Sequence, residues 1–125
     1  MRKEVKMTTN HVELHNHLED QITKLGNELS GPMSGFARLH SKAVEDGVLN
    51  GKTKELIALA ISVAIRCEGC ISYHVHDAIR AGATRPEIIE AIGVAILMGG
   101  APAAVYATYA MEAIEQFSKV QNLNK

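Results

Sequence analysis

The chain has 125 residues with a formal net charge of −1, from 13 basic and 14 acidic side chains, and it has no tryptophan. A single domain fits this length, and a near-neutral charge with 4% aromatic residues argues against nucleic acid as a partner. Residues 1–9 are polar and charged, so we expect a flexible N-terminal segment ahead of one domain at residues 10–125. The uncharged run at residues 56–65 is about half of a membrane span, and we expect a cytoplasmic protein without membrane contact.

Apolar residues recur at steps of three and four along most of the chain, and no stretch alternates as a β-strand does. We therefore predict an all-α fold, a compact bundle of about six helices. The first helix carries one apolar stripe, formed by Leu14, Leu18, Ile22, Leu25 and Leu29. Gly31 and Pro32 are expected to end this helix. A second helix through residues 36–44 is closed by Gly47, and a turn follows at residues 50–51.

The third helix, at about residues 53–65, is apolar almost all round. Cys67 and Cys70 open a fourth helix, for which Gly82 is the expected residue after the C-terminal cap. Residues 84–87, Thr-Arg-Pro-Glu, form a capping box with proline in the first turn. This pattern predicts the start of a fifth helix.

The fifth helix is expected to run to about Ile96 and a sixth from residues 103 to 119, with Gly99, Gly100 and Pro102 between them. The third, fifth and sixth helices show little polar surface. A helix that is hydrophobic all round must be buried, and three such helices exceed what the rest of this chain can cover. We therefore expect a homo-oligomer.

The cysteine pair is the main candidate for a functional centre. Cys67 and Cys70 form a C-x-x-C at a helix start, where unpaired N–H groups and the helix dipole favour a thiolate. Gly69 between them is expected to let the backbone bend so that the two sulfurs approach. His74 follows Cys70 by one helical turn and is expected to take its proton or to stabilise the thiolate. We therefore expect Cys70 to attack first and Cys67 to act as the resolving thiol.

Glu55 is the second candidate for a functional residue. An acidic residue in the first turn of a helix often only stabilises the helix through its dipole. Glu55 precedes Cys67 by twelve residues, about 18 Å along a straight helix, so it cannot touch that cysteine. If the fourth helix folds back antiparallel, His74 returns toward Glu55. His74 would then lie between the carboxylate and the thiols, as a proton relay requires.

Two other interpretations of the cysteines remain open. They are small buried hydrophobic residues with His74 as a core histidine, or they are zinc ligands together with His74. Glu55 or another histidine would supply the fourth zinc ligand. Most tetrahedral zinc sites take their second ligand pair from a separate segment, so we prefer the redox pair, which needs no metal and no cofactor.

The other histidines are expected to have structural roles. His11, His15 and His17 crowd the first helix, where a solvated polar face is the expected arrangement. His40 lies on the apolar stripe of the second helix and is expected to be a core or interface histidine, with a supporting place near the thiols as the alternative. His76 is expected to point to another side of its helix than His74.

The spacing E-x11-C-x2-C-x3-H, formed by Glu55, Cys67, Cys70 and His74, is followed by Gly-Ala-Thr at residues 82–84. With these residues the chain resembles the carboxymuconolactone decarboxylase superfamily, and the C-x-x-C makes it similar to the alkylhydroperoxidase D-like branch. The resemblance runs from about residue 36 to residue 113 and implies an all-helical fold assembled as trimers or hexamers. It also implies that the cysteine pair reduces a peroxide, that a dithiol electron donor recycles it, and that the Glu and His form a proton relay.

In the best-known enzymes of that branch a histidine stands between the cysteines, where this chain has Gly69. Because of this departure, the resemblance does not identify the substrate or the reductant of this chain. The preferred interpretation is a thiol-dependent peroxidase or disulfide oxidoreductase. The alternatives are a ring-lactone decarboxylase, which has no evident use for a C-x-x-C, and a non-catalytic zinc-binding assembly module. Bound zinc would favour the module, whereas a reversible disulfide would favour the enzyme.

Overall fold

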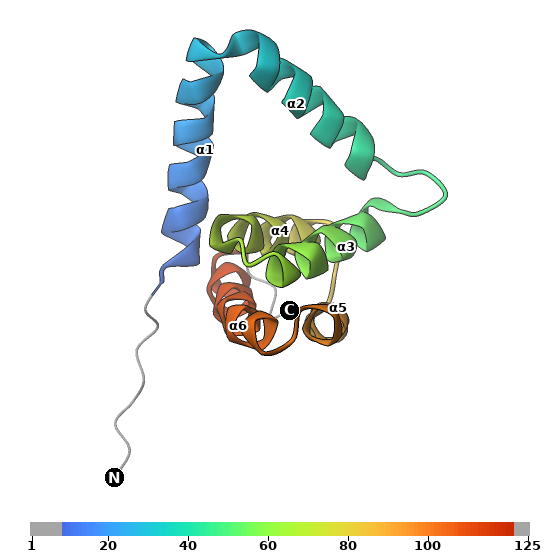
Figure 1. Cartoon of the computed structure of the whole chain (residues 1–125). Helices are drawn as coiled ribbons and strands as arrows, with labels where there is room; N and C mark the ends of the chain where they lie inside the picture. Colours follow the sequence, from blue (N-terminus) through green and yellow to red (C-terminus); the bar gives the residue numbers. More distant parts are fainter. Residues whose placement is uncertain (1–8, 122–125) are drawn as a thin grey trace.

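The computed structural model describes residues 9–121, and in this range the chain forms helices and no strand (Figure 1). The elements are α1 (His11–Glu28), α2 (Ser30–Val44), α3 (Gly51–Ala64), α4 (Glu68–Arg80), α5 (Arg85–Gly99) and α6 (Ala101–Gln121). The predicted all-α class with six helices is therefore confirmed. Most of the expected flexible segment, residues 1–8, lies outside the described residues, as do residues 122–125. Within residues 9–121, no helix is long and apolar enough to cross a membrane.

The core lies between α3, α4, α5 and α6, which pack against one another. Its largest fully buried apolar side chains are Phe117, Leu59, Ile71, Ile88, Val63 and Val75. Helix α1 packs along α4 and α6, whereas α2 buries no side chain and leaves the body. In Figure 1, α1 and α2 form two sides of an open triangle that α3 and α4 complete. The site described below lies on this third side.

Two helix boundaries differ from the sequence prediction. Gly31 and Pro32 open α2 and do not end α1, because proline is tolerated in the first turn, where its missing N–H has no helical partner. Helix α3 begins at Gly51, earlier than expected, because the Asn50 side chain accepts a hydrogen bond from the Thr53 N–H at 2.8 Å. The predicted capping box at the start of α5 is confirmed.

The first-helix histidines also differ from the prediction, since His11 and His15 are buried, with exposed fractions of 0% and 4%. His11 Nδ1 lies 2.7 Å from Ser72 Oγ, and its backbone N–H donates to Gln116 Oε1 at 2.6 Å. Burial lowers the pKa of His11, and the nearby carboxylate of Glu112 partly offsets this effect. A neutral imidazole with a hydroxyl partner is compatible with burial, so α1 docks through polar groups at its N-terminal half.

The turn between α3 and α4 is a Schellman motif that brings the cysteine pair into place. The N–H of Cys67 donates to the Ser62 carbonyl at 3.0 Å, and the N–H of Arg66 donates to the Val63 carbonyl at 3.1 Å. Arg66 has a φ of 62°, the left-handed conformation that such a motif requires and that glycine usually adopts. The chain thus passes from α3 into α4 with no free loop.

Helix α4 ends in the same motif, with the expected glycine. Ala83 N–H donates to the Ala78 carbonyl at 2.9 Å, and Gly82 N–H donates to the Ile79 carbonyl at 3.0 Å. Gly82 has a φ of 96°, which confirms its predicted place after the C-terminal cap. The two turns form a natural comparison, because one motif has glycine and the other arginine at the left-handed position.

We predict that Arg66→Gly raises the free energy of unfolding by about 0.5–1 kcal/mol, because glycine removes the Cβ clash of the left-handed conformation. Urea denaturation of the two proteins measures the difference. Gly82→Ala is the matched control, since no atom lies within 4 Å of the added Cβ and only backbone strain changes. It should lower the free energy of unfolding by about 1 kcal/mol. An Arg66→Gly protein less stable than the parent would contradict the analysis.

Candidate functional site

The two cysteines lie at the start of α4 and are joined in a disulfide. Cys67 is the N-cap residue, and its Sγ accepts a hydrogen bond from the Cys70 N–H at 3.3 Å. The Cα atoms are 5.2 Å apart, within the usual range for a disulfide, and the first turn of α4 stays intact. Both cysteines are partly exposed. In the reduced state the N-cap position favours a thiolate at Cys67, because N–H groups and the helix dipole point at its sulfur.

Gly69 has a different role from the one the sequence suggested. It lies inside α4 with a regular helical conformation, so it supplies no bend. A Cβ at this position would come within 2.9 Å of Leu18 Cδ1 on α1. The glycine therefore lets α1 pack closely on the turn that holds the cysteines.

Glu55 and His74 meet because α3 and α4 run antiparallel from the Schellman turn. Glu55 Oε1 lies 3.4 Å from His74 Nδ1, so the two side chains touch without an intervening group. Glu55 is 5% exposed and His74 is partly buried. Neither of these two atoms has a hydrogen-bond partner in this form. A small movement that places Nδ1–H on the carboxylate would leave Nε2 as the basic nitrogen of His74.

Two further residues lie beside this pair, His40, for which a supporting place was the less favoured prediction, and Asp77, which was not predicted. His40, on α2, is exposed, and its ring lies edge-on to His74 with 6.3 Å between ring centroids. Asp77, on α4, follows His74 by three residues and so shares its side of the helix. His40, Glu55 and Asp77 each place one ligand atom within 4.8 Å of the others. The i, i+3 spacing was a signal for Asp77, whereas only the tertiary fold brings His40 here.

A cavity of about 510 Å³ opens beside these residues, between α2, α3 and α4. Its polar lining includes His40, Glu55, Asp77 and Arg80. The cavity therefore reaches the carboxylate of Glu55, while the cysteines are not among its lining residues. Chemically, the site combines a dithiol that closes to a disulfide with a buried acid–imidazole pair on the same two helices.

Comparison with known proteins places this arrangement in one group. The family model of the carboxymuconolactone decarboxylase family matches residues 32–113, a range that contains Glu55, Cys67, Cys70 and His74. An uncharacterized protein of Cupriavidus necator is 36% identical over 105 residues, which are 84% of this chain and 93% of that protein.

Two solved structures support the same grouping. A carboxymuconolactone decarboxylase family protein from Legionella pneumophila has a TM-score of 0.83 at 42% identity and covers 86% of this chain and 96% of its own. A family protein from Thermotoga maritima, described with a possible role in antioxidative response, has a TM-score of 0.71 at 28% identity. That match covers 82% of this chain and 93% of the Thermotoga chain.

Proposed function

The chain belongs to the carboxymuconolactone decarboxylase family, and from that premise we propose that it is a thiol-dependent peroxidase or disulfide oxidoreductase. The observation that carries the proposal is the Cys67–Cys70 disulfide at the start of α4. A pair that closes without disturbing the helix can cycle between dithiol and disulfide at low structural cost. The antioxidative role suggested for the Thermotoga maritima relative supports a peroxide as the oxidant.

The proposed reaction has three balanced steps. The Cys70 thiolate attacks the outer oxygen of a hydroperoxide, the O–O bond breaks, and Cys70 sulfenic acid and an alcohol form after proton transfer. The Cys67 thiolate then attacks the Cys70 sulfur, and the hydroxyl group leaves as water when it takes up a proton. A dithiol electron donor reduces the resulting disulfide, restores both thiols and becomes a disulfide itself.

The surrounding residues have distinct proposed roles. His74, one helical turn after Cys70, takes the proton of the attacking thiol, and Glu55 at 3.4 Å stabilises the imidazolium that forms. Cys67 at the N-cap is held as a thiolate, which makes it a resolving nucleophile. The same stabilisation makes Cys67 a good leaving group when the donor attacks Cys70.

We also propose that the working form is a homo-oligomer, a trimer or a hexamer. Apolar side chains face away from the body on several helices: Phe36 and Leu39 on α2, Ile61 on α3, and Leu97 and Met98 on α5. Leu97 is 79% exposed, and both α2 residues are 63% exposed. Large apolar side chains exposed in this number favour a protein–protein interface. Copies of the same chain would cover the open side of the α1–α2 arm.

The redox proposal is tested with reduced protein and one equivalent of hydrogen peroxide. Peptide mapping should find Cys67 linked to Cys70, with a mass loss of about two hydrogens that dithiothreitol reverses. Cys67→Ser should stop at a sulfenic acid on Cys70 that dimedone traps, and Cys70→Ser should not consume peroxide. Thiols that stay free under excess peroxide would disprove the proposal. A trapped sulfenic acid on Cys67 would reverse the order of attack.

The relay is tested by the pH profile of iodoacetamide alkylation in a Cys67→Ser background, where only Cys70 reacts. His74→Ala should shift the profile upward by roughly one pH unit or more, because the thiolate loses its ion-pair partner. Glu55→Gln should give a smaller shift in the same direction, and the double variant should add little to His74→Ala.

His17→Ala is the control for the relay, since it removes an exposed imidazole on α1, and it should leave the profile unchanged. An unchanged profile in His74→Ala would show that this histidine does not act on the thiol. A Glu55→Gln shift that adds in full to the His74→Ala shift would show that Glu55 acts through its helix.

Assembly is tested by light scattering during size-exclusion chromatography at micromolar concentration. The parent should have a mass of several chains, and Phe36→Glu should reduce it, because a charge in an apolar interface is unfavourable. Val48→Glu is the matched control, since Val48 is fully exposed in the loop after α2 and should not alter the mass. A well-folded monomeric parent would contradict the proposed assembly.

A further inference from the structure

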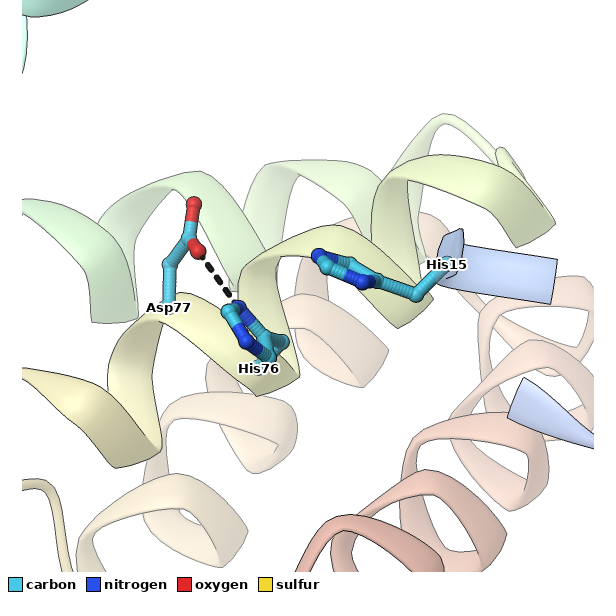
Figure 2. A group of neighbouring side chains, drawn as sticks. All are labelled: His15, His76 and Asp77. Carbon is cyan, nitrogen blue, oxygen red and sulfur yellow. Dashed lines mark hydrogen bonds and ion pairs between the residues drawn. The ribbon is translucent and has the colours of Figure 1, made fainter. Parts of the chain in front are cut away.

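A second polar cluster lies between α1 and α4, on another side of α4 from Glu55. Figure 2 shows its three members, His15 from α1 and His76 and Asp77 from α4, with their side chains gathered in one place. Each offers one ligand atom within 4.8 Å of the others. The two imidazole rings stack with 4.0 Å between centroids, and Asp77 Oδ1 lies 2.8 Å from His76 Nδ1.

The buried member of this cluster has an unused nitrogen. His15 is 4% exposed, and its Nε2 makes no hydrogen bond. The nearest carboxylate oxygen, Glu19 Oε1, lies 3.7 Å away on the next turn of α1, beyond hydrogen-bond distance. A buried polar atom without a hydrogen bond is unfavourable, and an ion at the site would satisfy it.

The charge of the cluster suits a cation. Glu19 and Asp77 are acidic, and within residues 9–121 no lysine or arginine forms an ion pair with either. Two imidazoles stacked this closely would repel each other if both were protonated.

The surroundings also fit a metal site. Asp77 Oδ1 lies 2.8 Å from His76 Nδ1, so these two candidate ligand atoms already lie side by side. Phe117, which is buried, contacts both rings with centroid distances of 5.7 and 5.4 Å and closes the inner side. Glu19 and Asp77 are partly exposed, so an ion can enter from solvent. Because the two rings are stacked, joint binding of one ion requires the rings to turn about their χ2 torsions, which are broad for histidine.

We propose that His15, His76 and Asp77, with Glu19 as the fourth ligand, bind a divalent transition-metal ion of the zinc type. Two imidazole nitrogens and carboxylate oxygens are ligands that Zn²⁺ accepts in tetrahedral geometry. The site uses no thiol, so it is independent of the redox state of the cysteines. Since two ligands come from each helix, the ion joins α1 to α4 and fixes the helix that packs on Gly69.

The test is calorimetric titration of Zn²⁺ into the full chain with the Cys67–Cys70 disulfide formed, so that thiols do not compete. About one ion per chain should bind, and His76→Gln and Asp77→Asn should each weaken the affinity about tenfold or more. His17→Gln is the matched control, because His17 is exposed on the same helix as His15, and it should bind as the parent does. Circular dichroism confirms that each variant is folded.

A second measurement reports the predicted link between the helices. Amide exchange in α1 should slow when Zn²⁺ is added to the parent and should stay unchanged in His76→Gln. Three results would overturn the proposal: no binding at 100-fold excess of zinc, binding that His76→Gln leaves intact, or binding that His40→Ala abolishes. The last result would place the ion in the cluster of His40, Glu55 and Asp77 instead.

Discussion

The hydrogen bonds of Cys67 are the constraint on which the site depends. Its N–H closes the end of α3 on the Ser62 carbonyl, and its Sγ caps the start of α4 by accepting the Cys70 N–H. One residue thus joins two helices with no loop between them, and the two helices run antiparallel. That return brings Glu55 to His74. The turn that carries the proposed redox cysteines therefore also determines how Glu55 and His74, the proposed proton relay, are placed.

Local sequence patterns were sufficient to predict much of this arrangement of helices. Helical periodicity predicted the class and the number of helices, and the glycine at position 82 and the Thr-x-x-Glu box predicted two boundaries that the structure has. The approach of His74 to Glu55 was expected from helical rise on the condition that the fourth helix returns antiparallel, and in the structure the two side chains lie 3.4 Å apart. The chemical roles of these residues stay proposals.

The features that the sequence did not predict depend on which helix surfaces pack against each other. Local sequence patterns do not specify this packing. His11 and His15 are buried only because α1 packs its polar N-terminal half on α4, where Ser72 and His76 receive them. Gly69 was interpreted as a bend, yet its role is set by Leu18, a residue distant in sequence. Arg66 takes a conformation that sequence rules assign to glycine, and the two Schellman hydrogen bonds hold it there.

Helix α4 serves both proposed sites, and Asp77 is the residue they share. His74 faces Glu55 on α3, while His76 faces His15 on α1, and Asp77 lies close to both groups. Its carboxylate bonds to His76 Nδ1 in this form, and an ion bound between these two atoms would take the place of that hydrogen bond. An ion that holds Asp77 toward α1 removes negative charge from beside Glu55 and His40. By thermodynamic linkage, any group that draws Asp77 toward Glu55 must weaken the metal by the same factor. If Asp77 ligates the ion, the two proposed sites share one carboxylate on α4, and occupancy of one site changes the charge beside the other.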